Sequence, residues 1–311
     1  MDDHDDSRLR QQEQHLRATE EAVPSSSKKR WRLLAHTISK KRRTEGDDDL
    51  TLSVCRRFLT FGLMQYGEMA APAASSGIWK SVTFAPGHGD ASFHAAVHLL
   101  SDEAVSVEDL VGFNNTGNVC IWPAEEVMAY YVGKYAKICA GRRVVELGAG
   151  MTGVAGLCAA SVKAESVLLT DGNEKSVANL DLIVRHSNFS NVSARLLRWD
   201  APADLEGLEH SVDIILAADC LFFNEYRLPL LDTIVKLLSS NGEAYIFAPS
   251  RSGTFDKFAD LAKLRDELSI EIETDYDEVV SSGRDAAALL CASNGFDENL
   301  HYPKLIVLRR K

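Results

Sequence analysis

The sequence lacks any apolar run of the ~18 residues that a membrane-spanning helix requires. Its first residues, MDDHDDSRLR, are acidic and polar and do not resemble a secretory signal peptide. Six cysteines are present, but they form no Cys-x-x-Cys pair and no spacing typical of a zinc site. We therefore expect no membrane association, no bound metal, and reduced thiols in a protein of the cytoplasm and nucleus.

A surplus of basic residues is also missing. Lys and Arg number 34 against 45 Asp and Glu, which gives a net charge of −11. Residues 1–49 hold 11 of each sign, so the whole excess of acid lies in residues 50–311. Nucleic-acid phosphates demand a basic surface, so this balance argues against a nucleic-acid partner. With 45% apolar residues and no internal repeat, 311 residues fit one large globular domain or a domain with an added subdomain.

The first 49 residues divide into a polar arm and a basic segment. Residues 1–27 have no sustained apolar stripe and end in Pro-Ser-Ser-Ser, so we expect disorder there. Residues 28–43 carry eight Lys and Arg and no acid, with apolar residues at helical spacing from Trp31, and an acidic linker follows up to residue 49. Such a basic amphipathic helix is typical of a calmodulin target or a membrane-surface helix. A two-part nuclear-import signal and a helix that packs on the domain remain alternatives.

The most informative stretch is 143–171. It opens with a short apolar run, breaks at Gly148-Ala149-Gly150, continues as an apolar helix, and closes with a strand that ends at Asp171. Strand, glycine turn, helix and acid-tipped strand form a nucleotide-binding βαβ unit. The glycines let a ligand approach the backbone, and the acid can accept both hydroxyls of a ribose.

The glycines alone do not identify the ligand, because Gly148, Gly150 and Gly153 also match the dinucleotide pattern G-x-G-x-x-G. Glu146 lies just before the turn, where a carboxylate would face a pyrophosphate with the same sign of charge. It suits a cofactor with a positive end, such as S-adenosylmethionine. We therefore favour the methyl donor, with NAD as the alternative.

Beyond Asp171, strands and helices continue to alternate. This pattern predicts an open, doubly wound Rossmann-like sheet of seven strands with helices on both faces. Further strands are expected at 194–199, 212–218, 244–248, 270–274 and 305–309, separated by helices at 173–186, 225–238 and 255–268. The last strand follows a loop and helix, and we place it as an antiparallel edge.

Two regions precede this sheet. Residues 50–121 alternate and carry Gly and Pro breaks, so LTLSVCRRFLTFGLM, IWKSVTFAPG and SFHAAVHLL are expected to be strands of an N-terminal accessory β-rich region. A helix then follows Trp122-Pro123 and leads into the glycine-turn unit. We take residues 122–311 as the methyltransferase domain, with Trp122 over the cofactor cleft, although a Trp before a helix also commonly packs as a plug.

Ligands of an open parallel sheet bind at the carboxyl ends of its strands. Trp199, at the end of the third strand, can cover an adenine. Asp219 follows Ala218 at the end of the fourth strand, and Phe222 can return to the same side of the cleft. An aromatic ring attracts a cation and a carboxylate orients an amine, so this pair suits a lysine side chain. Of the two neighbouring phenylalanines, 222 and 223, we expect one to pack in the core.

A lysine that accepts a methyl group must first lose its proton. Its ordinary pKa of ~10.4 leaves about 0.1% neutral near pH 7.4, a cost of roughly 4 kcal/mol. Burial beside a sulfonium lowers that pKa, whereas Asp219 alone raises it. We therefore assign Asp219 to binding and orientation, with the proton lost to water.

These residues resemble a known family. The strings VVELGAGMTGVAGL, LLTDGNEKSVANL, LRWD, ADCLFFNEYR and NTGNVCIWPAEEVMAYY are similar to those of the seven-strand protein-lysine methyltransferases, sometimes called family 16, and within it to the members that modify calmodulin. The likeness covers roughly residues 29–311. The sequence departs from the family at one point. The wider superfamily usually reads G-x-G-x-G, whereas Thr152 occupies the place of the third glycine and Gly153 follows. This departure affects the expected local turn and not the expected cofactor.

The resemblance implies transfer of methyl groups from S-adenosylmethionine to one lysine of calmodulin, up to trimethyllysine, by a monomer in the cytoplasm and nucleus. Matched by motif, the cofactor contacts are Trp122, Gly148, Ala149, Gly150, Asp171, Trp199 and Ala218. Asp219 and Phe222 match the family's D-x-x-F/Y pair at the lysine channel. Because calmodulin is acidic like the enzyme body, residues 28–43 are the expected docking element.

Three alternatives differ in function. The first is a relative that methylates a lysine of another protein, such as an elongation factor. The second is a non-catalytic calmodulin-binding protein that uses residues 28–43. The third is an NAD oxidoreductase, which should bind nicotinamide and not the methyl donor.

Overall fold

The computed structural model describes residues 61–311 except 72–76, 86–92, 100–120 and 290–295. The expectations for the polar arm, the basic segment and most of the first accessory strand lie outside the described residues. Within the described ranges, no helix combines the length and apolarity needed to cross a membrane.

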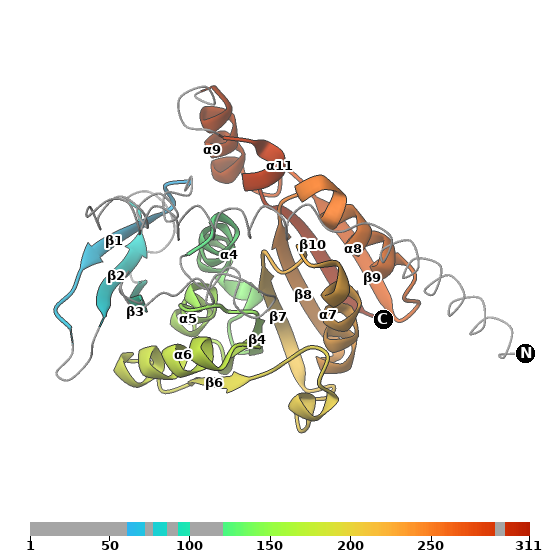
Figure 1. The fold of residues 1–311 in the computed structure, drawn as a ribbon, viewed down its shortest axis with the longest axis horizontal. Helices are drawn as coiled ribbons and strands as arrows, with labels where there is room; N and C mark the ends of the chain where they lie inside the picture. The colour runs from blue at the N-terminus through green and yellow to red at the C-terminus, as the bar shows by residue number, and fades with distance from the viewer. Residues whose placement is uncertain (1–60, 72–76, 86–92, 100–120, 290–295) are drawn as a thin grey trace, which may run out of the picture.

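A seven-stranded sheet forms the centre of the molecule (Figure 1), with strand order β6-β5-β4-β7-β8-β10-β9. Its strands are β4 (Arg143–Leu147), β5 (Ser166–Asp171), β6 (Val192–Leu196), β7 (Val212–Ala218), β8 (Leu238–Ala248), β9 (Leu268–Glu273) and β10 (Lys304–Arg310). β4 pairs in parallel with both β5 and β7, and the strand order reverses between them. Ligands of open α/β sheets bind at such a switch point.

The predicted seven strands and the antiparallel direction of the last one are confirmed, but its predicted position at the edge is wrong. β10 lies between β8 and β9 and is antiparallel to both. Its central residues 305–308 are all buried, as an interior strand requires, whereas β9 (LSIEIE) is buried only at Leu268 and exposes Ser269, Glu271 and Ile272, as an edge strand does. Sequence order therefore did not give spatial order here.

Helices cover both faces of the sheet (Figure 1). α4 (Pro123–Lys134), α5 (Val154–Ser161) and α6 (Glu174–His186) lie on one face, and α7 (Asn224–Leu237) and α8 (Thr254–Lys263) lie on the other. Strand side chains alternate between the two cores: Ile214 and Leu216 pack with the first set, Ile215 and Ala217 with the second. The helices expected in this part of the chain are thus confirmed, with α8 shorter than predicted.

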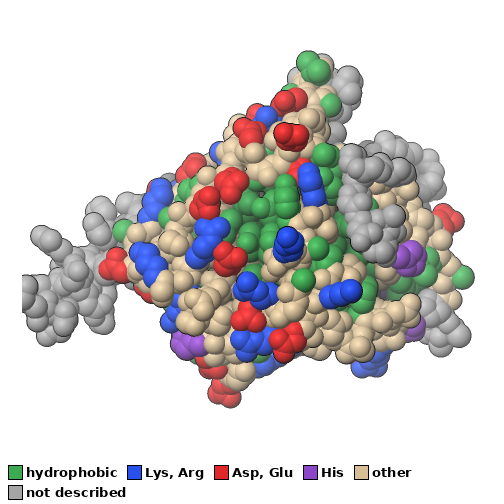
Figure 2. Space-filling view, turned by 180° about the vertical axis from the view of Figure 1, so that it is seen from behind, with side chains coloured by type: hydrophobic (Ala, Val, Ile, Leu, Met, Phe, Trp, Pro, Cys, Tyr) green, Lys and Arg blue, Asp and Glu red, His purple; other side chains and the backbone are tan. Residues whose placement is uncertain are grey.

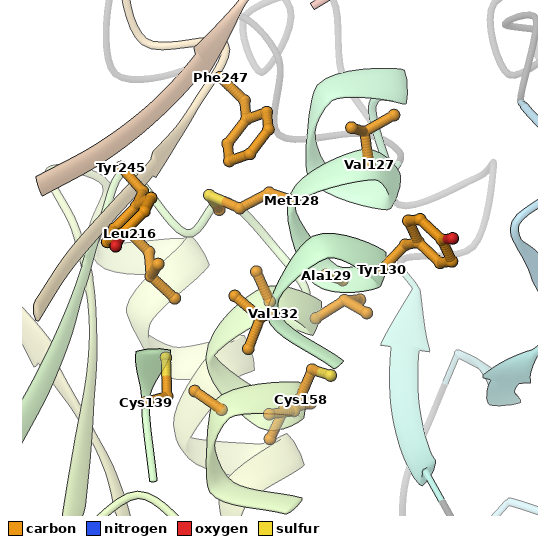
Figure 3. Packing of buried hydrophobic residues seen from close by; sticks show 14 of the residues in the cluster. Val127, Met128, Ala129, Tyr130, Val132, Cys139, Cys158, Leu216, Tyr245 and Phe247 are labelled. Carbon is orange, nitrogen blue, oxygen red and sulfur yellow. The ribbon is translucent and has the colours of Figure 1, made fainter. Parts of the chain in front are cut away.

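The helix α4 packs tightly between the large sheet and the N-terminal strands. Figure 3 shows its Met128 directed toward Phe247, while Tyr130 points to the opposite side. There the Tyr130 ring meets Phe84 edge-on, with 6.4 Å between ring centroids. Because α4 is buried on both sides, the residues at its N-terminus, including Trp122, have a defined position over the sheet.

The N-terminal strands form a separate antiparallel sheet of β1 (Met64–Glu68), β2 (Ile78–Phe84) and β3 (His94–Leu99). The expected strands at 78–87 and 92–100 correspond to β2 and β3. Glu126 of α4 anchors the entry to β1, accepting hydrogen bonds from the N–H groups of Phe61, Leu63 and Met64 at 3.0, 2.9 and 3.2 Å. The domain boundaries assigned from sequence stay predictions.

The remaining short elements lie near the C-terminal end of the chain. The turn η5 (Arg251–Gly253) follows β8, and α9 (Glu278–Leu289) and α11 (Glu298–His301) precede β10. Seen from behind, hydrophobic side chains gather in the middle of the surface, with Lys, Arg, Asp and Glu side chains around them (Figure 2).

Candidate active site

The turn after β4 is built from left-handed glycines and is bonded to the tip of β5. Gly148 and Gly150 have φ angles of 69° and 61°, a conformation that glycine adopts without steric cost. The Gly150 N–H donates to Asp171 Oδ2 at 2.9 Å, and the Asn173 N–H donates to Oδ1 at 2.8 Å. The predicted turn and the predicted acid therefore meet at adjacent strand ends.

The departure at the third glycine position moves the turn by one residue. Thr152 is buried, and the next left-handed residue is Gly153, with a φ of 54°, which precedes α5. A Cβ atom on Gly153 would lie 3.0 Å from a methyl group of Leu169 in β5. Glycine is thus required one position later than in the usual pattern.

Trp199 and Cys220 lie against Gly148. A Cβ atom added at Gly148 would lie 2.8 Å from Cys220 Sγ and 3.4 Å from the Trp199 ring. β6 ends at Leu196, earlier than predicted, so Trp199 reaches the turn from the loop that follows. The ends of β4, β6 and β7 therefore converge, as the strand-end argument predicted. The cofactor contacts assigned from the sequence all stay predictions, namely those of Trp122, Gly148, Ala149, Gly150, Asp171, Trp199 and Ala218.

Two buried carboxylates lie behind the glycine turn. Glu125 of α4 accepts a hydrogen bond from the Ala155 N–H at 2.8 Å, and Glu146 of β4 accepts one from the Gly156 N–H at 2.7 Å. Both N–H groups belong to the first turn of α5, the positive end of that helix. Burial raises the pKa of Glu125 to about 7. Burial, followed by the neighbouring charge of Glu125, raises the pKa of Glu146 well above its ordinary value.

These carboxylates favour a cationic cofactor over a dinucleotide. A pyrophosphate binds to free N–H groups at a helix N-terminus, but carboxylates of the chain already take two of those groups in α5. Asp171 is a third acid of this group, and burial raises its pKa to about 6. These three buried acids oppose a phosphate, because their raised pKa values show that ionising them together is already unfavourable, whereas a nearby sulfonium or ammonium favours their ionised forms. The direct contact predicted between Glu146 and the cofactor stays a prediction.

A second group of residues follows β7 and β8. Asp219 Oδ2 lies 2.6 Å from a terminal nitrogen of Arg251, and the two side chains are only 10% and 23% exposed. The Arg251 guanidinium carbon lies 5.7 Å from the Trp122 ring centroid and 5.9 Å from that of Phe222. A carboxylate and two aromatic faces all attract positive charge. We call Asp219, Trp122 and Phe222 the cation seat.

Backbone strain is concentrated at this seat. Asp219, Arg251 and Ser252 have φ angles of 55°, 35° and 60°. Each such conformation costs a non-glycine residue about 1–3 kcal/mol, and it persists only where the surrounding structure imposes it. The left-handed Asp219 turns its side chain out of the line of β7, while its N–H donates to the Phe247 carbonyl at 2.8 Å.

The two phenylalanines after β7 have different environments, as expected. Phe223 is only 4% exposed and belongs to the core, whereas the half-buried Phe222 faces Arg251. Sequence reasoning left Arg251 without a role, although it lies just beyond the end of β8, where the strand-end rule applies. It also missed Glu125, because acids in the first turn of a helix ordinarily face solvent.

No group of three or more His, Cys, Asp or Glu side chains among the described residues is arranged to hold a metal ion.

Comparison with known protein families gives an independent result. Residues 105–264, just over half of the chain, match the family model described as lysine methyltransferase. The chain belongs to the lysine methyltransferase family. Enzymes of this family depend on S-adenosylmethionine, and this chain therefore takes the same cofactor.

Individual relatives of this methyltransferase differ in what they modify. This chain is 36% identical over 159 residues to the calmodulin-lysine N-methyltransferase of Arabidopsis thaliana. The aligned segment covers 49% of this chain and 52% of the Arabidopsis protein. This chain is also 30% identical over 160 residues to the protein N-lysine methyltransferase METTL21A of Danio rerio, covering 50% and 71%. The match thus spans about half the length of the Arabidopsis relative.

Comparison with solved structures gives matches of low identity and low TM-score. A putative S-adenosylmethionine-dependent methyltransferase from Streptococcus mutans aligns with a TM-score of 0.48 and 15% identity, covering 78% of this chain and 56% of that one. The fold assignment itself rests on the strand order of the methyltransferase sheet.

We predict that Asp171→Ala weakens S-adenosylmethionine binding about 10- to 100-fold, because it removes charge-assisted hydrogen bonds to the ribose and to the Gly150 N–H. Isothermal titration calorimetry measures the change. The matched control is Asp213→Ala, which removes a carboxylate bonded to Arg143 at the opposite end of the sheet. Unchanged affinity in the Asp171 variant would remove that residue from the cofactor site.

We also predict that the stability of the cofactor-free enzyme falls as the pH rises from about 4.5 to about 7. The folded-state pKa of Glu125 is raised from 4.5 to about 7, so folding holds its proton and stability is lost on ionisation. Each pKa unit corresponds to about 1.4 kcal/mol. Glu125→Gln should flatten this fall in urea unfolding at a series of pH values, and the exposed Glu165→Gln should not. An equal slope in both variants would contradict the prediction.

Proposed function

We propose that this methyltransferase transfers methyl groups from S-adenosylmethionine to a lysine of calmodulin, up to trimethyllysine. The cation seat carries the proposal: the Asp219 carboxylate and the Trp122 and Phe222 rings all face the Arg251 guanidinium, and Asp219 can still accept a hydrogen bond from an amine. A site that holds a cation at the carboxyl ends of the strands suits an amine that accepts a methyl group.

The choice of calmodulin rests on two further observations. Identity is 36% to the Arabidopsis calmodulin-lysine N-methyltransferase, against 30% to METTL21A and 27% to the lysine methyltransferase EFM7 of Candida glabrata. The basic segment 28–43 supplies the positive charge that an acidic enzyme body needs to approach an acidic substrate. The same segment fits nuclear import, and we propose a monomer that acts in the cytoplasm and nucleus.

The direct test is mass spectrometry of unmethylated recombinant calmodulin after incubation with the enzyme and methyl donor. A mass gain of one to three methyl groups on one lysine supports the proposal. In parallel, labelled donor is added to a cell extract. A labelled protein other than calmodulin, such as an elongation factor, would assign the enzyme to that substrate instead.

We predict that Asp219→Asn lowers kcat/KM on calmodulin by about 10- to 100-fold, because the amine loses a charge-assisted hydrogen bond. Calorimetric S-adenosylmethionine affinity should change little, since Asp219 is bonded to Arg251, whereas Asp171 is the carboxylate that holds the glycine turn. Asp256→Asn, an Asp on the exposed side of α8, serves as the matched control. Full activity in Asp219→Asn would mean that the amine binds elsewhere.

We further predict that deleting residues 1–44 lowers kcat/KM on calmodulin at low salt, and that the difference shrinks as salt rises. The deletion removes all eight basic residues of the 28–43 segment, and long-range attraction between charges is screened by salt. Turnover is compared at several salt concentrations with and without the arm. An unchanged kcat/KM at low salt would leave import or packing as the role of the segment.

A further inference from the structure

The cation seat already contains a cation of the chain itself. Arg251 donates to one carboxylate oxygen of Asp219 at 2.6 Å, and its guanidinium lies near the Trp122 and Phe222 rings. The pair is mostly buried, so its charges are screened by water far less than those of a surface ion pair. Burial raises the pKa of Asp219, and the adjacent Arg251 opposes that rise by favouring the carboxylate.

A lone carboxylate would hinder the reaction that the seat serves. An ionised Asp stabilises a lysine ammonium and so raises its pKa above the ordinary ~10.4. Only the neutral amine has a free electron pair to accept a methyl group. The reaction therefore needs a carboxylate oxygen of Asp219 that accepts a hydrogen bond from the amine, while the negative charge of Asp219 is offset.

We propose that Arg251 is a positioning residue that neutralises Asp219, so that the seat binds the substrate lysine as the neutral amine. The inference rests on the proposed lysine methylation and deepens it. Arg251 occupies Oδ2, and a carboxylate has about four lone-pair sites in all, so Asp219 can still accept an N–H from the amine. A protonated lysine would meet the guanidinium as a like charge, and its proton is lost to water on entry.

Among the described residues, the other titratable groups near the seat do not supply this positive charge. Burial lowers the pKa of His301 in α11, and the positive charge of Arg251 lowers it further against an opposing effect of Asp297, so the neutral imidazole is favoured. Burial raises the pKa of the Cys220 thiol well above its ordinary value, so it stays protonated. The acids Asp171, Glu125 and Glu146 are bonded to N–H groups of the glycine turn and of the first turn of α5, not to Arg251.

The backbone supports a fixed position for the guanidinium. Arg251 and Ser252 have left-handed φ angles, and Gly253 follows with a φ of 85°. Three consecutive left-handed residues form a tight turn at the end of β8, directly opposite the strained Asp219. The turn brings the Arg251 side chain back over the sheet rather than out into solvent.

The test is the pH dependence of kcat from about pH 6.5 to about 10 in the full-length enzyme. The substrate is calmodulin, or the protein that the extract-labelling experiment assigns instead. A unit charge about 5 Å away at an effective dielectric constant of ~20 shifts a pKa by about 2 units. In the wild type, kcat rises with pH as the bound lysine loses its proton, and the apparent pKa of this rise is the quantity measured. For Arg251→Gln, we expect that apparent pKa to increase by the same amount. The variant should then lose about 10- to 100-fold of kcat near pH 7 and recover it toward pH 10.

Three further variants separate charge from structure. Arg251→Lys keeps the positive charge and should shift the limb by less than about half a unit. Asp219→Asn with Arg251→Gln removes both charges, so its kcat is lower but its apparent pKa should return close to that of the wild type. Arg143→Gln, which breaks the ion pair with Asp213 at the far end of the sheet, should leave the limb unchanged. Thermal midpoint and S-adenosylmethionine affinity report whether each variant is folded.

Two outcomes would overturn the inference while leaving lysine methylation intact. If Arg251→Gln lowers kcat by the same factor at every pH, Arg251 only shapes the loop. If the variant is more active near pH 7, Arg251 blocks the seat and competes with the lysine. Should Arg251→Gln fail to fold, the pH profile of Arg251→Met, a neutral side chain of similar length, decides between these results.

Discussion

The active site depends on how the chain satisfies the first N–H groups of α5. In dinucleotide-binding proteins these groups are available to a phosphate. Here Glu125 and Glu146 bond to two of them from behind the glycine turn. The helix dipole thus stabilises carboxylates of the protein itself, and the cofactor side of the turn faces a group of acids. A cofactor with a positive end is favoured for this electrostatic reason, independently of the glycine pattern.

The same constraint connects the two ends of the site. Glu125 reaches the first turn of α5 because α4 packs across that turn. Trp122, the residue just before α4, lies at the cation seat. The neighbouring Glu126 holds the entry to β1. Cofactor turn, aromatic wall and N-terminal sheet are therefore positioned by one buried helix. A displacement of α4 would disturb donor binding and lysine binding together.

Much of the methyltransferase sheet could be predicted because its signals are local. The apolar run before Gly148 and the acid at Asp171 lie within one βαβ unit, and β7 was placed at its observed bounds of 212–218. The place of β10 could not be predicted, since hydrophobic pattern reports burial and not which strand is the neighbour. The partners of Glu125 and Arg251 are likewise 30 and 32 residues away in sequence, which no periodicity reveals.

The sequence by itself determined the class of the protein: glycine turn, acid-tipped strands and the D-x-x-F pair are short patterns whose chemistry follows from residue type and spacing. Only the tertiary structure decided which charges meet. The packing of the chain places Glu125 and Glu146 against the N-terminus of α5. It also places the left-handed Gly153 one position later than the usual pattern and Arg251 against Asp219. Hydrogen bonds and ion pairs act over a few ångströms, so they depend on how distant segments pack, and that information is spread over the whole chain.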